Sequence, residues 1–183
     1  MAEQLVSSWS DGKTLPESYI LPPETRPGET VVPTSNSLPV IDLGKTQGFD
    51  RKETIQKIIE ASQKFGFFQV INHGVPRKVC DDANGAFKEF FELPLEEKSK
   101  FYSLDLSKKC ILYTSNVDYD KEEIHNWRDS LRLECTPLED CIKSWPEKPA
   151  HYRVSGTDYL GHSLVHNPSV YLCCTQFLGL VES

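Results

Sequence analysis

The sequence has little of several features that mark common classes of protein. Lysine and arginine number 20 against 27 aspartate and glutamate residues, so the formal net charge is −7. The chain therefore lacks the basic surplus that nucleic acids and anionic membranes attract. Its longest apolar run, residues 169–181, is too short and too interrupted to span a bilayer. We expect no nucleic acid and no membrane as partner.

The first residues also lack a targeting pattern. Residues 1–13 contain neither a basic leader nor a continuous apolar segment of the length found in signal peptides. This predicts a cytoplasmic protein, in which thiols stay reduced. The cysteines form no Cys-x-x-Cys pair, so we interpret them as small core residues rather than metal ligands or disulfides. They are Cys80, Cys110, Cys135, Cys141, Cys173 and Cys174.

Motifs of the common catalytic classes are missing from the sequence. It contains no Gly-x-Ser-x-Gly motif, no phosphate loop and no dinucleotide fingerprint. A mononuclear iron(II) oxygenase binds its metal through two imidazoles and one carboxylate, for which His-x-Asp or His-x-Glu is the expected local signature. No histidine is followed by an acid two positions later, and the histidines are His73, His125, His151, His162 and His166. We therefore expect no metal ligands and no cofactor in this chain.

Three further patterns contain residue types that can form a binding or metal site. His73 ends the apolar run of residues 65–75, and we interpret it as a strand-end residue whose imidazole donates to a neighbouring carbonyl while Gly74 turns the backbone. His162 and His166 are four residues apart, but the segment lacks the glutamate of zinc proteases. Two Arg-x-Ser triplets, at 128–130 and 153–155, are interpreted as coincidental without a metal site before them.

Regular elements are predicted from residue 37 onward, after a proline-rich extended arm over residues 1–36. Residues 38–44 are typical of a first strand. Asp50 and Glu53 have the spacing of a capping box for a helix over residues 51–64. That helix places apolar residues on one face, namely Ile55, Ile58 and Ile59 with Ser62.

The next elements complete a mixed α/β order. Residues 67–74 predict a strand whose continuous apolarity favours cover on both faces. A helix begins at Pro76 and ends at Pro94, and its apolar stripe comprises Val79, Ala83, Phe87, Phe90 and Phe91. A charged helical turn over residues 95–102 and two strands, at 108–116 and 131–135, follow.

Three segments follow from this pattern. An acidic loop over residues 116–127 joins the last two strands, of which the second alternates as a half-exposed strand does. The predicted domain covers residues 37–153 and is mixed α/β. Residues 154–183 fit neither a helix nor a strand for long, and we interpret them as a divergent tail.

Several spaced motifs together resemble a known module. They are LPVIDL, FGFFQVINHGV, FFELPLEEKSKFY, NWRDSLRL and SWPEKPAHYR. Over about residues 5–153 the chain resembles the N-terminal region of plant 2-oxoglutarate and iron(II)-dependent dioxygenases, in particular the hyoscyamine dioxygenase-like group. The resemblance implies helices and strands that flank a double-stranded β-helix, or jelly roll, in the full-length family. It also implies an oxidoreductase family that hydroxylates or otherwise oxidises small molecules of specialised metabolism.

The resemblance implies iron(II) and 2-oxoglutarate as cofactors of the full-length family. The family binds them through His-x-Asp, a distal His and an Arg-x-Ser in its C-terminal half, so none of these ligands is carried over to this chain. At the place of His73 the family has a scaffold histidine. The segment that matches the family's substrate mouth contains Trp127, Leu131 and Leu133, and these side chains either face substrate or pack the sheet.

Three hypotheses follow for function. The first is the N-terminal module of a plant oxygenase, inactive alone as a truncated isoform or gene-model artefact, with exposed apolar surface and self-association. The second is a non-catalytic interaction module that binds a full-length paralogue or another protein. The third is an active oxygenase with an unconventional site built from His151, His162 and His166.

Overall fold

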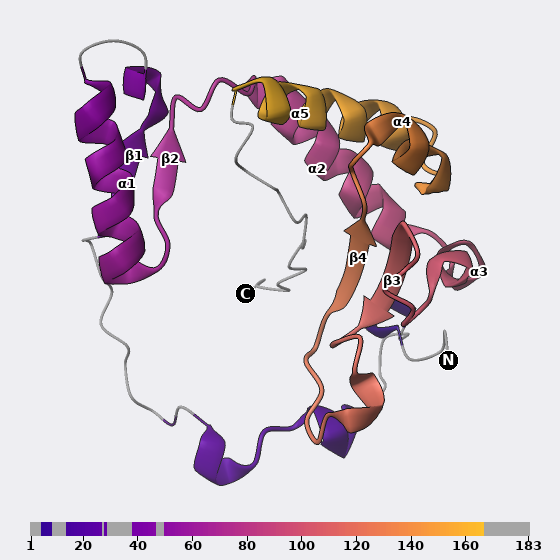
Figure 1. Ribbon diagram of the computed structural model, residues 1–183. Helices are drawn as coiled ribbons and strands as arrows, with labels where there is room; N and C mark the ends of the chain where they lie inside the picture. The colour runs from indigo at the N-terminus through magenta and orange to yellow at the C-terminus, as the bar shows by residue number, and fades with distance from the viewer. Residues whose placement is uncertain (1–4, 9–13, 27, 29–37, 47–49, 167–183) are drawn as a thin grey trace. The chain divides into compact units, whose positions relative to one another are not determined.

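The computed structural model describes residues 5–8, 14–26, 28, 38–46 and 50–166 (Figure 1). These residues divide into two compact units. The smaller unit comprises residues 28–80 and 158–166, and the larger comprises residues 5–26 and 81–157. In the described part of the chain, no helix combines the length and the apolar character required to cross a membrane.

The smaller unit is built around a strand, helix, strand arrangement. β1 (Val40–Asp42) and β2 (Gln69–Ile71) pair in parallel, with α1 (Arg51–Phe65) as the connection between them. A helical crossover is the usual connection between parallel neighbours. Gly66 ends α1 in a left-handed conformation with φ 76° and donates its amide to the Ser62 carbonyl. The predicted order of these elements is confirmed.

Two details of α1 differ from prediction. The Asp50 side chain forms no cap, and Thr54 instead donates its amide and hydroxyl to the Asp50 carbonyl. Glu53 pairs with Lys57 at 2.7 Å, so the predicted capping box is wrong. The helix buries Thr54 and Ala61. The buried face of α1 is therefore shifted by about one residue from the predicted face, since Ile55 and Ile59 of that predicted face are 40% and 43% exposed.

β2 is also more exposed than its apolarity predicts. All three of its residues are exposed, so the prediction of cover on both faces is wrong for this unit. Within the described residues of this unit, β2 pairs with β1 alone, and this pairing leaves its side chains exposed. The exposed apolar side chains of the unit, hereafter the apolar surface, are Val40, Ile55, Ile59, Phe67, Val70 and Ile71. Exposed apolar surface was expected of strands that flank a larger sheet.

The larger unit contains the hydrophobic core and most of the elements. Its helices are α2 (Arg77–Glu92, from residue 81 on), α3 (Leu95–Lys98), α4 (Leu138–Cys141) and the first residues of α5 (Tyr152–His166). β3 (Cys110–Thr114) and β4 (Asp129–Leu133) form an antiparallel hairpin. The core cluster comprises Leu5, Ala86, Phe90, Phe91, Cys110, Leu112, Leu131 and Tyr152.

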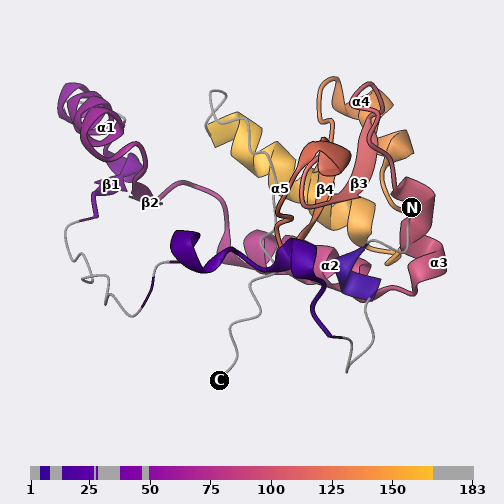
Figure 2. The same ribbon diagram turned by 90° about the horizontal axis from the view of Figure 1, so that it is seen from below.

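The helix and hairpin of this unit pack as the apolar stripe predicts. α2 buries Ala83, Phe90 and Phe91. The start of α5 lies beside α2 in both views (Figures 1 and 2), and the Tyr152 ring meets the Phe90 ring at 5.7 Å. Aromatic pairs in such tilted contact contribute about 1 kcal/mol beyond the area they bury. The predicted stripe is thus confirmed, and a mixed α/β fold with it.

The C-terminal helix contradicts the prediction for residues 154–166. We expected no regular element there because of Gly156 and Gly161, yet both lie in α5. A Cβ atom added at Gly156 would lie 3.0 Å from the Trp145 ring. Glycine is used here for close packing rather than to break the helix. Residues 167–183 of the predicted tail lie outside the described residues.

β4 begins two residues earlier than predicted and alternates less. Asp129, Ser130 and Leu131 are all buried, so the strand begins with a fully covered segment, and its first two residues precede the range 131–135 for which half exposure was predicted. The cause is a segment distant in sequence, residues 5–8, which covers Asp129. Sequence periodicity carries no information about such a partner.

The prediction that the cysteines are small core residues is confirmed for two of the four described ones. Cys110 and Cys141 are buried and all four described cysteines are free, whereas Cys80 and Cys135 are only partly buried. Burial raises the pKa of the Cys110 thiol to about 12, so it stays protonated and unreactive at neutral pH. The remaining pair, at positions 173 and 174, lies outside the described residues.

Candidate functional site

Asp129, at the start of β4, fastens the beginning of the chain to the hairpin. Its carboxylate accepts the amides of Val6 and Ser7 at 2.9 and 2.7 Å and the Thr114 hydroxyl at 2.5 Å. The side chain is 2% exposed. A buried carboxylate is stable only when its oxygens are bonded in this way. Asp129 therefore fixes both the arm and the first residue of β4.

Lys98, at the end of α3, is a second buried charged residue that bonds to the arm. Its ammonium group donates to the Ser7 carbonyl, the Ser7 hydroxyl and the Phe91 carbonyl, at 2.8–3.1 Å. Desolvation lowers the pKa of Lys98, and the charge of Asp129 opposes that shift. The charged turn was predicted, but a lysine that is 1% exposed within it was not. No local pattern distinguishes it from the exposed lysines nearby.

Aromatic side chains of the acidic loop between β3 and β4 gather around Tyr19 of the arm. This aromatic cluster comprises Tyr19, Tyr119, His125 and Trp127. Tyr119 and His125 stack at 3.7 Å with an angle of 11°, and Tyr19 meets Trp127 edge-on at 6.0 Å. The arm is bonded to the loop as well, because the His125 amide donates to the Ser18 carbonyl at 2.7 Å. Burial, followed by the contact with Tyr119, raises the pKa of Tyr19.

A buried serine at the end of β3 supports the aromatic cluster. Ser115 has φ 58°, a conformation that few non-glycine residues adopt, and its side chain is fully buried. Its hydroxyl donates to Glu122 at 2.6 Å and accepts the Asn126 amide at 2.6 Å. Glu122 in turn faces His125 at 3.4 Å. Such strain is retained where the surroundings fix it, often at functional sites.

The structure separates the three predicted substrate-facing residues. Trp127 is 44% exposed and belongs to the aromatic cluster. Leu131 is 6% exposed in the core, and Leu133 packs against that core. Sequence reasoning missed Tyr19, because the arm that carries it shows no periodicity. That Trp127 meets a substrate stays a prediction.

The arginines of the two Arg-x-Ser triplets bond to backbone groups. Arg128 donates to the Ser115 carbonyl at 3.4 Å. Arg153 donates to the carbonyls of Trp145 and Lys143 at 2.7–3.1 Å. Each guanidinium thus stabilises a turn of the larger unit.

The described histidines do not converge on a metal site. His73 accepts the Val75 amide at Nδ1, and Gly74 turns the backbone with φ 84° as predicted. That the imidazole donates to a carbonyl stays a prediction. His151 faces Glu89 at 3.6 Å, and Nδ1 of His162 lies 2.8 Å from a carbonyl of its own helix. Across the described ranges, no three His, Cys, Asp or Glu side chains are grouped to hold a metal ion. These residues do not fit an iron centre.

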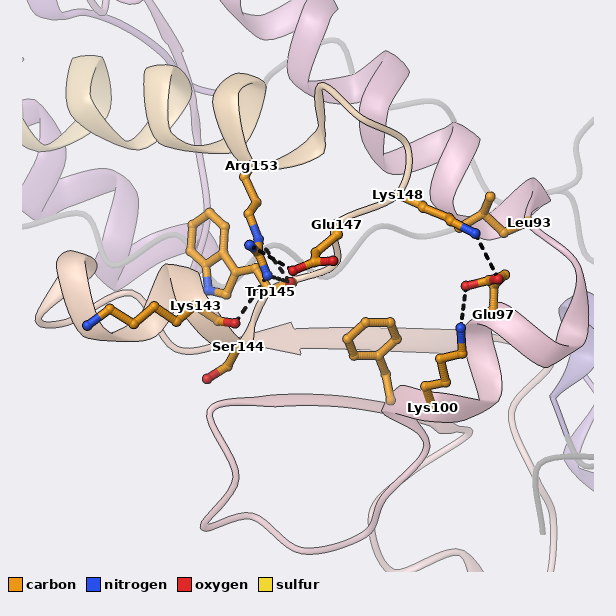
Figure 3. A pocket seen from close by; sticks show the side chains of 10 residues that line it. Leu93, Glu97, Lys100, Lys143, Ser144, Trp145, Glu147, Lys148 and Arg153 are labelled. Atoms are coloured by element: carbon orange, nitrogen blue, oxygen red, sulfur yellow. Dashed lines mark hydrogen bonds and ion pairs between the residues drawn. The ribbon is translucent and has the colours of Figure 1, made fainter.

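A cavity of about 300 Å³ opens elsewhere in the larger unit (Figure 3). Its walls come from the end of α2, from α3 and the turn after it, from the segment after α4, and from the first turn of α5. Leu93, Phe101 and Trp145 supply apolar surface. The remaining lining residues are Glu97, Lys100, Lys143, Ser144, Glu147, Lys148 and Arg153.

Comparison with known proteins identifies the family. A model of the N-terminal domain described as "non-haem dioxygenase in morphine synthesis" matches residues 38–149. The chain belongs to this family. Its dioxygenase N-terminal domain thus includes both strand pairs, the acidic loop and most of the cavity wall.

Relatives of this dioxygenase N-terminal domain are plant enzymes. DOWNY MILDEW RESISTANCE 6 of Arabidopsis thaliana is 42% identical over 153 residues, which are 84% of this chain and 44% of that protein. Hyoscyamine 6-dioxygenase of Hyoscyamus niger is 42% identical over 157 residues, which are 81% of this chain and 44% of that protein. The chain thus spans less than half the length of these relatives.

A solved structure agrees with this assignment. A crystal structure of JOX2 in complex with 2OG, Fe and JA matches 88% of this chain and 44% of its own, with a TM-score of 0.65 and 30% identity. The family depends on 2-oxoglutarate and iron(II), as the resemblance implied. The expected membership in the plant dioxygenases is confirmed.

Proposed function

We propose that this chain is the N-terminal module of a plant 2-oxoglutarate and iron(II)-dependent oxygenase that oxidises a small molecule of specialised metabolism. The match of residues 38–149 to the dioxygenase N-terminal family carries this proposal. Relatives named as dioxygenases or hydroxylases support it, including feruloyl CoA ortho-hydroxylase 1 of Arabidopsis thaliana at 36% identity. The module builds a scaffold for a catalytic jelly roll and is cytoplasmic.

We further propose that these 183 residues do not catalyse the reaction alone. What supports this is the sequence itself, in which no histidine has the acidic neighbour of an iron site. Iron(II) would supply oxygen activation in the parent enzyme. The module would contribute substrate contact through Trp127 and the rest of the aromatic cluster, which Ser115 and Glu122 hold in place.

The test is turnover of 2-oxoglutarate by the purified chain. With iron(II), ascorbate and oxygen present, we expect no succinate above the level of a chelator-treated sample. A full-length relative assayed beside it confirms that the conditions support catalysis. Succinate formation by this chain that a chelator abolishes would contradict the proposal, and loss of that activity in His162→Ala would revive the unconventional site with His151 and His166.

A second candidate function is binding to a full-length paralogue or another protein. The apolar surface of the smaller unit favours it, because six large apolar side chains there are 39–64% exposed. An immobilised chain should then capture the full-length paralogue with saturable binding. Replacement of Phe67 and Ile71 by serine should weaken that capture, whereas non-saturable adsorption would leave only the scaffold role.

A further inference from the structure

The cavity of the larger unit combines an apolar floor with paired charges at its rim. Phe101 and Leu93 pack against the hydrophobic core, and Trp145 is 1% exposed with its indole N–H bonded to the Glu134 carbonyl at 3.0 Å. These side chains are held rigidly by their surroundings. A rigid apolar floor of this size accommodates a single aromatic or alicyclic ring system.

Cations outnumber carboxylates around this floor. Glu97 receives both Lys100 and Lys148, at 2.6 and 2.9 Å, as Figure 3 shows. Arg153 bonds to Glu147 at 3.3 Å. Three cations thus share two carboxylates, which leaves one positive charge at the rim. Lys143 extends its ammonium group away from the other side chains and pairs with Asp140 at 3.4 Å, so it is left out of this balance.

The arrangement around Glu97 shows how an anionic oxygen is held at this rim. Two ammonium groups approach one carboxylate from different elements, α3 with its following turn and the loop before α5. Each ammonium has three N–H donors, so each retains donors after its bond to Glu97. The two lysines lower the pKa of Glu97 to about 2, so that this carboxylate stays charged and keeps them in place. Ser144 is exposed and lies at the opposite wall of the cavity (Figure 3).

We propose that this cavity is a binding site for a small organic anion, with its ring against Phe101 and Trp145 and its carboxylate on Lys100 and Lys148. The site is separate from the aromatic cluster and does not depend on the proposed function. An aromatic carboxylate can pack its ring on the apolar floor and accept hydrogen bonds from the unused ammonium donors at the same time. A neutral ring compound makes only the contact with the apolar floor.

The experiment is calorimetric titration of the full chain with 2-naphthoate at low ionic strength. We expect saturable binding with one site per chain that weakens as salt is raised. Uncharged 2-naphthamide, which has the same ring system, should bind at least tenfold more weakly. In an amide NMR spectrum, 2-naphthoate should shift the indole signal of Trp145 and leave that of Trp127 in place.

Two variants locate the site independently. Lys100→Gln with Lys148→Gln should weaken binding of 2-naphthoate at least tenfold, about 1.4 kcal/mol. Ser144→Tyr keeps every charge but fills the cavity, so it should abolish binding. The matched control is Lys52→Gln with Lys88→Gln, two exposed lysines outside the cavity lining, which should bind as the parent chain does. Circular dichroism confirms that each variant is folded.

Two results would overturn the proposal. The first is equal binding of 2-naphthoate and 2-naphthamide, which would indicate adsorption to apolar surface alone. The second is binding that neither the lysine variant nor Ser144→Tyr alters, which would place the ligand elsewhere on the chain.

Discussion

Two buried charged side chains determine where residues 5–8 lie in the larger unit. Asp129 and Lys98 are 2% and 1% exposed, yet Asp129 bonds to the arm and the hairpin and Lys98 bonds to the arm and to the Phe91 carbonyl of α2. A buried charge without partners would cost several kcal/mol, so these bonds make the position of residues 5–8 obligatory. Neither residue could be predicted from the sequence, because the partner segment lies more than 90 residues away.

Replacement of Asp129 by alanine should destabilise the chain by about 3 kcal/mol. The change leaves the amides of Val6 and Ser7 and the Thr114 hydroxyl without their acceptor, and unpaired buried donors cost about 1–3 kcal/mol each before relaxation. Urea unfolding followed by circular dichroism measures the loss. Asp140→Ala, at an exposed surface pair, should change the unfolding free energy by less than about 0.5 kcal/mol.

The Glu97 carboxyl should titrate far below its ordinary range. Its hydrogen bonds to Lys100 and Lys148 lower the pKa from 4.5 to about 2. Because the folded value lies below the unfolded one, the stabilisation is present above pH 4.5 and is lost as the pH falls toward about 2. NMR titration of the side-chain carboxyl checks the value. In Lys100→Gln with Lys148→Gln, the pKa should return toward 4.5, and a midpoint that stays low would contradict the pairing.

Elements with a strong local pattern were predicted, and those with a distant partner were not. α1, α2 and β3 have apolar periodicity or continuous apolarity, and each lies where the sequence placed it. The buried face of α1 was misplaced because its neighbours in the unit decide which residues are covered. The aromatic cluster could be predicted only through Trp127, since Tyr19 reaches it from an arm without periodicity.

The glycines of α5 offer a test of helix packing. Gly156→Ala should destabilise the chain by about 1 kcal/mol, because the new Cβ would meet Trp145 at 3.0 Å and overpack a buried ring. Gly161→Ala has nothing within 4 Å of the new Cβ and should stabilise α5 by about 0.5–1 kcal/mol. Thermal unfolding of the two variants compares them directly. Equal stabilisation by both would show that Trp145 does not constrain the helix.

At the scale of the whole molecule, the apolar surface of the smaller unit is the feature that favours association between chains. A two-stranded parallel sheet with one helix has too little cover to bury strands as apolar as β2. In the proposed parent enzyme, the jelly roll would supply that cover. Alone, the chain should associate through this surface.

Light scattering after gel filtration should find species larger than the 20.8 kDa chain. Ile55→Lys with Ile59→Lys, one turn apart on the exposed face of α1, should shift the chain toward the monomer. Leu106→Lys with Val154→Lys replaces two apolar residues of the larger unit that are more exposed than Ile55 and Ile59, and it should leave the association unchanged. A monodisperse parent chain that melts cooperatively would contradict the prediction.

The bonds from Val6 and Ser7 to Asp129 join positions 123 and 122 residues apart in sequence. During synthesis the chain grows from its N-terminus, so Leu5 emerges from the ribosome long before the strand that will cover it. Leu5 therefore stays in contact with solvent or chaperone until translation has passed residue 129. The order of synthesis thus makes residues 5–8, which are synthesised well before β4, one of the last segments to reach their native place.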